Sequence, residues 1–142
     1  MKSLLILGAG GFGRMIKETA LALGYEEVLF LDDTAKDDDV IGRCCDYHLY
    51  HRDYSVAVAA FGNNKTRLFW TQKLLEEEYE VPAIVHPSAI VSPSVRLEPG
   101  CFIMQRAVVN MNTTIKMAAL INSGAVVDHD SIVEEGAHAV SY

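Results

Sequence analysis

The sequence has few positive charges and no long apolar run, and each absence excludes a class of function. Twelve lysines and arginines stand against 19 aspartates and glutamates, which gives a formal net charge of −7. This excess of negative charge argues against a nucleic acid or an anionic membrane surface as partner. The longest apolar stretches fall well short of the about 20 residues that a membrane span needs. Glycines and charges break the apolar run that follows Lys2, so we exclude a signal peptide.

Cysteine is also scarce. The chain has three, Cys44, Cys45 and Cys101; adjacent cysteines rarely pair, and an odd number leaves one over, so we expect a reducing cytoplasm. Cys44 and Cys45 lie near His48 and His51, which raises a metal hypothesis. The spacing is poor for zinc, whose structural sites usually join two separated ligand pairs. We therefore expect no metal here, only a loop with a short helix.

A period of six residues runs from Ala83 to the end of the chain. Nearly all residues two positions before the repeating aliphatics are small, as at Ala107. The repeating aliphatics are Val85, Val91, Leu97, Ile103, Val109, Ile115, Ile121, Val127 and Val133. This period fits neither a helix nor a half-buried strand. It is typical of a hexapeptide parallel β-helix, in which each repeat forms one flat side of a prism and its large aliphatic points inward.

The residues before Pro82 show a different pattern. We predict strands over residues 3–7, 28–33 and 56–62, and helices from the glycine turn to about Gly24 and from about 66 to 79. Residues 34–55 are polar and irregular. This order predicts a small three-layer parallel α/β unit, Rossmann-like, over residues 1–81, followed by the β-helix over 82–142.

A glycine motif lies between the first predicted strand and helix. Gly8, Gly10 and Gly13 match the pattern G-x-G-x-x-G, and Asp32 follows Gly13 by nineteen residues, as in dinucleotide-binding folds. Such a loop would hold any nucleotide diphosphate. A dehydrogenase needs a second mononucleotide half, so a nucleotide or nucleotide sugar is favoured over nicotinamide. A purely structural turn is the remaining alternative.

His129 lies between Asp128 and Asp130, two residues after the inward Val127 and near a corner of the prism. An imidazole beside a carboxylate is a candidate general base, because the carboxylate fixes its tautomer and stabilises the imidazolium. His138 occupies a position where the register holds small residues, which would let it line the same groove. The alternative for His129 is a solvated surface histidine among acids.

Together these features resemble the hexapeptide-repeat sugar acetyltransferases of the sialic-acid O-acetyltransferase and UDP-amino-sugar N-acetyltransferase type. The matching segments are LILGAGGFG, LDD at 31–33, FGNNKTR at 61–67, HPSAIVSPSV at 86–95 and INSGAVVDHD at 121–130. The resemblance implies a left-handed β-helix and transfer of an acetyl group from acetyl-CoA to an amine or hydroxyl of a nucleotide-linked sugar. It also implies a homotrimer with each active site between neighbouring β-helices.

The resemblance further implies roles for individual residues. His129 matches the catalytic base and Asp130 its acidic partner, while His138 and Asn122 are expected at the acetyl-CoA site, and no metal is required. The residues expected to meet the sugar substrate are Gly10, Gly11, Phe12, Asp32, Asp33, Gly62 and Asn63.

Three departures from the family pattern bear on activity. Phe12 stands where the family's glycine loop commonly has histidine. The glycine that often follows the inward aliphatic is replaced by Met104, Lys116 and Glu134, which suggests an eroded repeat. The chain stops at Tyr142 after little more than three β-helix turns, whereas family members continue with turns that hold much of the CoA site.

We therefore expect an open sheet edge at the last turn, covered by a partner chain. Two other functions stay open. One is a shortened homologue that keeps nucleotide-sugar binding and oligomerisation but is impaired in catalysis. The other is an NAD-dependent oxidoreductase, which the single mononucleotide half disfavours.

Overall fold

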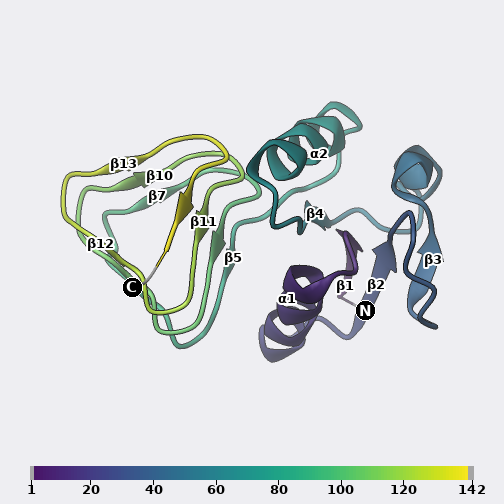
Figure 1. Ribbon diagram of the computed structural model, residues 1–142, viewed down its shortest axis with the longest axis horizontal. Coiled ribbons are helices and arrows are strands. Elements are labelled where there is room, and N and C mark those ends of the chain that lie inside the picture. Colours follow the sequence, from purple (N-terminus) through teal and green to yellow (C-terminus); the bar gives the residue numbers. More distant parts are fainter. Residues whose placement is uncertain (1, 141–142) are drawn as a thin grey trace. The chain divides into compact units, whose positions relative to one another are not determined.

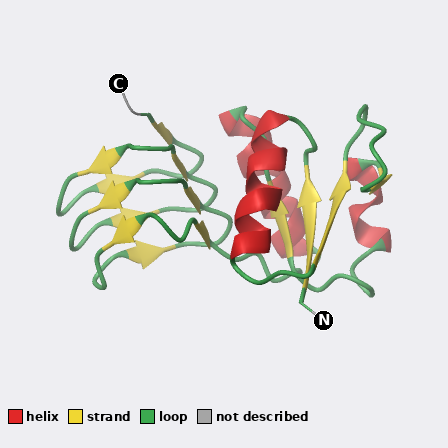
Figure 2. Cartoon of the chain, turned by 90° about the horizontal axis from the view of Figure 1, so that it is seen from below, coloured by secondary structure: helices red, strands yellow, loops and turns green. Residues whose placement is uncertain are grey.

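The computed structural model describes residues 2–140 and divides into two compact units, residues 1–81 and 82–142 (Figures 1 and 2). The boundary falls at Pro82, immediately before the period of six begins. Within the described residues, no helix is both long enough and apolar enough to cross a membrane. The chain end at 141–142, where we expected an open sheet edge, lies outside the described residues.

The first unit is a parallel α/β sheet with the strand order β3-β2-β1-β4. Its elements are β1 (Ser3–Leu7), α1 (Gly11–Ala22), β2 (Glu27–Leu31), β3 (Val40–Gly42), η1 (Cys44–Leu49), β4 (Ala57–Ala59) and α2 (Asn64–Glu76). Helix α1 packs on β1 and β2, and α2 lies on the other face of the sheet beside β4 (Figure 1). Leu4 to Leu7 are wholly buried, as expected of a parallel strand covered on both faces. The predicted three-layer unit is confirmed.

Several elements of the first unit differ from the prediction. Strand β3 lies in the segment predicted as irregular and pairs with β2, while η1 confirms the expected short helix. Helix α2 begins at Asn64, because the Asn63 side chain accepts a hydrogen bond from the Thr66 backbone N–H at 2.9 Å. It ends at Glu76, two residues before Glu78 takes the left-handed conformation at φ 65°.

The second unit is a left-handed β-helix whose coils stack as a triangular prism (Figure 1). Its two-residue strands are β5 (Ile84–Val85), β6 (Ile90–Val91), β7 (Arg96–Leu97), β8 (Phe102–Ile103), β9 (Val108–Val109), β10 (Thr114–Ile115), β11 (Leu120–Ile121), β12 (Val126–Val127), β13 (Ile132–Val133) and β14 (His138–Ala139). They form three parallel faces, with the orders β14-β11-β8-β5, β12-β9-β6 and β13-β10-β7. Each strand pairs with the strand one coil away, as Ile103 does with Val85 and Ile121.

The interior of the prism confirms the predicted register. Ile103, Ile115 and Ile121 are wholly buried, and the small residues Cys101 and Ala107 fill the positions two before the inward aliphatics. The polar residue Thr113 is also buried in this unit. It donates its hydroxyl to the Asp128 carbonyl oxygen at 3.0 Å, which satisfies its buried oxygen.

The corners of the prism require a left-handed residue at regular intervals. Residues with φ between 57° and 73° recur at every sixth position, at Gly100, Arg106, Asn112, Ala118, Gly124, Asp130 and Gly136. The left-handed position therefore lies three residues after the inward aliphatic, not one. The expected erosion of the repeat at Met104, Lys116 and Glu134 is thus wrong, because the backbone makes no left-handed turn at those three positions.

Candidate active site

His129 lies on the corner between β12 and β13. Its backbone N–H donates to Asp128 Oδ1 at 3.0 Å, and its Nδ1 lies 2.6 Å from Asp130 Oδ2. The imidazole is 60% exposed. The left-handed backbone of Asp130, φ 57°, turns the chain at this corner, so the side chains of His129 and Asp130 project from the prism as a pair.

The charges around His129 favour its protonated form. The hydrogen bond with Asp130 raises the pKa of His129 above its ordinary value, and the negative charges of Asp128 and Asp130 add to this effect. Because Asp130 engages Nδ1, Nε2 is the ring nitrogen with which the imidazole could exchange a proton with a ligand. The pair can therefore act as an oriented general base once the imidazole is neutral.

The other two residues expected on the acetyl-CoA side lie elsewhere on the same prism. His138 opens β14, on the face β14-β11-β8-β5, and Asn122 follows β11 on a corner of that face. Asn122 Oδ1 accepts the Ser123 backbone N–H at 2.8 Å. His129 lies between the other two faces. Within one chain the β-helix therefore does not bring these three side chains to a common groove.

The two faces that meet at His129 carry exposed aliphatic residues. Val126 on β12 is 69% exposed and Ile132 on β13 is 61% exposed. Ile90 lies on the same face as Val126, two coils away, and is 67% exposed. The candidate base is thus flanked by apolar surface on both sides.

In the first unit, some glycines are required by close packing and others border open space. A Cβ on Gly13 would lie 1.8 Å from the Gly8 carbonyl oxygen, and one on Gly8, at φ +101°, would lie 2.7 Å from that of Ala60. Both are required by the close packing of β1, α1 and β4. A Cβ on Gly10, Gly11 or Gly62 would meet nothing within 4 Å. These three therefore border open space, where a ligand could approach the backbone.

Asp32 joins the glycine loop to the turn after β2. Its side chain accepts the backbone N–H groups of Ala35, Ala9 and Thr34 at 2.8, 2.8 and 2.9 Å. Partial burial by itself would raise the pKa of Asp32, but these donors outweigh it and hold the pKa below its ordinary value. Asp32 therefore organises the loop, a role that the fingerprint alone did not predict.

Asp33 and Asp32 border a shallow hollow of about 440 Å³ at the carboxyl end of β2. Asp33 Oδ1 accepts the Cys44 backbone N–H at 3.0 Å, which fixes the start of η1 against this turn. Lys36 and Arg43 also line the hollow. It thus combines carboxylates and cations at the edge of the sheet where open α/β folds bind ligands.

The remaining predicted residues lie at the starts of the two helices. Phe12 is the second residue of α1 and is half-buried. Gly62 and Asn63 are exposed in the loop between β4 and α2, where Asn63 caps α2. Sequence reasoning missed Arg67, whose side chain is wholly buried beneath this loop. A lone arginine near a helix start is usually exposed, so the pattern carried no signal for its burial.

The cysteine-histidine segment has a structural role. Cys44 is buried against β2, its Sγ donates to the Leu31 carbonyl oxygen at 3.6 Å, and burial raises its pKa to about 12. Across residues 2–140, no three histidine, cysteine or acidic side chains are placed to hold a metal ion. The first unit therefore offers no reactive thiolate at this position.

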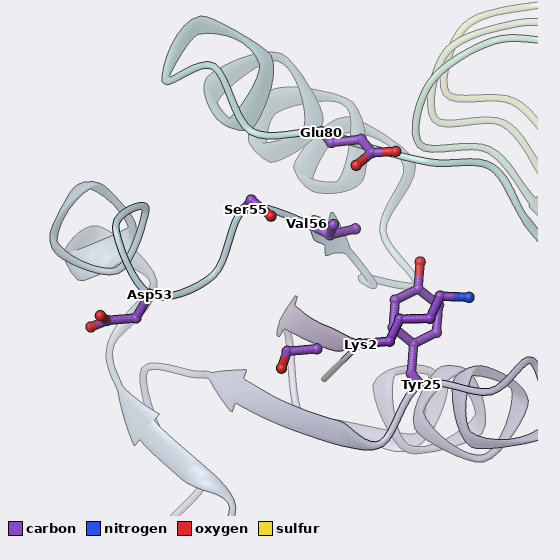
Figure 3. Close-up of a pocket in the computed structure, with 7 residues that line it drawn as sticks. Lys2, Tyr25, Asp53, Ser55, Val56 and Glu80 are labelled. Carbon is purple, nitrogen blue, oxygen red and sulfur yellow. The ribbon is translucent and has the colours of Figure 1, made fainter.

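A second hollow of the first unit, of about 320 Å³, lies at the amino ends of the strands (Figure 3). The Lys2 Nζ lies 4.1 Å from the centre of the Tyr25 ring, and Asp53 and Glu80 also line the hollow. It contains none of the predicted site residues and lies at the edge opposite the glycine loop. Parallel α/β sheets bind ligands at the carboxyl ends of their strands. We therefore place the candidate site at the edge beside the glycine loop and not in this hollow.

Known proteins share this combination of units. Residues 3–74 match the family model of the PglD N-terminal domain. The acetyltransferase domain of PglB from Neisseria gonorrhoeae, solved with acetyl coenzyme A, is 34% identical at a TM-score of 0.88; the match covers 96% of this chain and 69% of that one. PerB from Caulobacter crescentus, solved with CoA and GDP-perosamine, is 30% identical at a TM-score of 0.90, with coverage of 97% and 68%.

A third match is a histidine-to-asparagine variant of the perosamine N-acetyltransferase from Caulobacter crescentus, again with CoA and GDP-perosamine. It is 29% identical at a TM-score of 0.92, and the match covers 97% of this chain and 68% of that one. The matches to PglB and PerB extend over both units of this chain. The chain therefore belongs to the family of hexapeptide-repeat sugar acetyltransferases with a PglD N-terminal domain.

Proposed function

We propose that this protein transfers an acetyl group from acetyl-CoA to the amine of a nucleotide-linked amino sugar, with His129 as general base. The observation that carries the proposal is the His129–Asp130 pair, joined at 2.6 Å on an exposed corner of the β-helix. Its support from known proteins is that relatives were solved with acetyl coenzyme A, and with CoA and GDP-perosamine.

The chemistry follows from the pair. The neutral amine of the sugar attacks the carbonyl carbon of the thioester, and His129 Nε2 takes the proton that the nitrogen must lose as the C–N bond forms. Asp130 stabilises the resulting imidazolium. When the C–S bond breaks, the imidazolium returns the proton to the departing sulfur. The products are the N-acetylated sugar and CoA as its thiol.

The first unit would hold the nucleotide part of the substrate. The amino end of α1 carries a partial positive charge that favours an anionic group, and its N-cap Gly10 provides no side-chain cap. Gly11 and Gly62 leave room for a ligand at the same edge of the sheet. Phe12, Asp33 and Asn63 lie around this edge, while Asp32 keeps the loop in shape.

The active unit would be a homotrimer with each site between neighbouring β-helices. An imidazole that is 60% exposed lacks the walls that orient a substrate, and the flanking Val126 and Ile132 are unusually exposed aliphatics. A second copy of the chain on either face would cover them. It would also supply its His138 or Asn122 to a groove that one chain does not form. Three free cysteines are compatible with the expected cytoplasmic location.

The test is an acetyl-transfer assay on the 142-residue chain with acetyl-CoA and GDP-perosamine or a UDP-linked amino sugar. We expect an N-acetylated product by mass spectrometry. Replacing His129 with alanine should lower kcat about 10²–10⁴-fold and leave the circular dichroism spectrum unchanged. Binding of nucleotide sugar without any transfer would instead identify an impaired homologue, and normal turnover in His129→Ala would remove the proposed base.

A further inference from the structure

Arg67, on the first turns of α2, is wholly buried. Burial of a guanidinium is unfavourable unless hydrogen bonds compensate for the lost water. Desolvation lowers the pKa of Arg67 to about 10, which leaves the side chain protonated at neutral pH. A buried cation contributes little net stability, so its role must be sought in what it holds in place.

The guanidinium holds the loop between β4 and α2. Its Nη1 donates to the carbonyl oxygens of Phe61 and Gly62 at 3.0 and 3.3 Å, and its Nη2 donates to Asn64 Oδ1 at 3.0 Å. Two consecutive carbonyl groups of the loop are thereby directed at one buried cation. A planar fork of donors is suited to this task, and a lysine would not reproduce its geometry.

The direction of these carbonyls fixes the direction of the neighbouring N–H groups. Each peptide is planar and trans, and no cis bond occurs in the described chain. The N–H groups of Gly62 and Asn63 therefore point away from Arg67. The position above Gly62 is open for at least 4 Å, and both residues are exposed.

The same loop packs against the glycine loop. A Cβ on Gly8 would lie 3.1 Å from the Phe61 ring, so the loop after β4 and the loop after β1 are in contact. Both follow the carboxyl ends of neighbouring strands. The two N–H groups therefore lie at the edge of the sheet where the proposed function requires a nucleotide.

From this geometry we propose that Arg67 is a positioning residue: it orients the backbone N–H groups of Gly62 and Asn63 to donate to oxygen acceptors of the nucleotide part of the substrate. The inference rests on the proposed function, since it concerns the same substrate. Arg67 itself stays buried and does not touch the ligand. Gly62 and Asn63 thus act through their backbone N–H groups. A glycine suits position 62 because this role needs no side chain and the missing Cβ leaves the ligand more room.

The experiment compares Arg67→Lys, Asn64→Ala and Thr71→Val. Thr71 is also buried in α2 and donates to the Arg67 carbonyl oxygen at 2.7 Å, so its substitution disturbs the same helix but not the loop. Asn64 is exposed, and its substitution by alanine removes the acceptor of the Arg67 Nη2 hydrogen bond in a chain that should still fold. Affinity for the nucleoside diphosphate GDP or UDP is measured by calorimetry, well below each variant's unfolding temperature. Steady-state kinetics is measured alongside.

We expect Arg67→Lys to weaken nucleotide binding and raise KM for the nucleotide sugar about tenfold to a hundredfold. KM for acetyl-CoA and kcat should change less than about twofold. Asn64→Ala should show a smaller loss in the same direction, and Thr71→Val should lower the unfolding temperature without changing nucleotide affinity.

Two outcomes would overturn the inference. If Arg67→Lys and Asn64→Ala bind nucleotide as tightly as wild type, the arginine has only a structural role, and the proposed function survives. If the wild-type chain binds neither nucleoside diphosphate nor nucleotide sugar, the proposed function fails together with it.

Discussion

At the scale of single residues, two carboxylates among the predicted site residues make different contacts. Asp130 fixes one nitrogen of His129, whereas Asp32 bonds three backbone N–H groups. The sequence pattern assigned both to sites, but only the structure separates a partner of the imidazole from an organiser of a loop. That distinction depends on which amides lie within reach, and spacing along the chain does not encode it.

The acid limb of the pH–rate profile tests the contact between His129 and Asp130. A base works only when neutral, and the hydrogen bond with Asp130 raises the pKa of His129. The acid limb of kcat/KM should therefore lie above the ordinary histidine value of about 6.5. In Asp130→Asn the limb should move to lower pH, because the neutral amide no longer stabilises the imidazolium, and kcat should fall. Asparagine tolerates the left-handed conformation at this corner, so the fold is preserved.

Asp128→Asn is the matched control, since Asp128 contributes only charge to the imidazole and not a hydrogen bond. Its limb should move less than that of Asp130→Asn. A profile that is unaltered in both variants would show that His129 is not the titrating base.

At the scale of elements, the repeats were the most predictable part of the chain. The inward register is confirmed for the buried aliphatics from Ile103 to Val127, with Val85, Val91 and Val133 partly buried against them. Leu97, which was expected to point inward, is 36% exposed. Strand β3 was missed, since its three residues are half-buried and too short to show alternation. Arg67 was missed for the opposite reason, because its environment comes from a loop fold rather than from neighbours in sequence.

The left-handed corners give a stability prediction. Gly124 sits at a corner with φ 72°, a conformation that costs a residue with a Cβ roughly 1–2 kcal/mol. Gly124→Ala should therefore lower the free energy of unfolding by about that amount, measured by urea denaturation. Gly124→Asn should lower the free energy of unfolding less, because the short polar side chain of asparagine tolerates the left-handed conformation better than alanine does. Equal losses in the two variants would mean that crowding, not backbone conformation, sets the cost.

A charged cluster ties α1 to the segment before β3. Arg14 Nη1 and Lys17 Nζ each lie 2.6 Å from Asp39 Oδ2, and the Arg14 hydrogen bond is the largest cause that lowers the pKa of Asp39 to about 2. Between about pH 2 and pH 4, Asp39 is therefore ionised in the folded chain but protonated in the unfolded chain. Its stabilisation is full above pH 4 and is lost as pH falls toward 2.

The loss should be about 1–2 kcal/mol, since a shift of this size is partly screened where Arg14 is 35% exposed. Urea denaturation at several pH values below 5 measures it. In Asp39→Asn the decline with falling pH should be shallower, and Asp37→Asn, which removes a carboxylate that is itself 65% exposed, should behave as wild type. A wild-type slope in Asp39→Asn would contradict the assignment.

At the scale of the whole molecule, the β-helix presents a candidate base on an incomplete surface. If a trimer completes it, light scattering should give three times the chain mass of 15.6 kDa. Val126→Glu places a charge on the apolar face beside His129 and should yield monomers with strongly reduced acetyl transfer. Leu49→Glu, at an equally exposed position in the first unit, 64% against 69%, should remain trimeric. A monomeric wild-type chain with full activity would contradict the model of a shared site.

The pairing of each strand with one 18 residues away, as between Val109 and Val127, limits how the chain can change in length. Inserting or deleting a full coil leaves every later side chain on its original face and merely alters the height of the column. Removing a single hexapeptide would advance everything downstream by one third of a rotation, which would carry His129 to a different corner while hydrophobic burial stayed intact. Such a protein would fold normally and lack its reaction centre. The position of His129, rather than the stability of the fold, therefore limits insertions and deletions to whole coils.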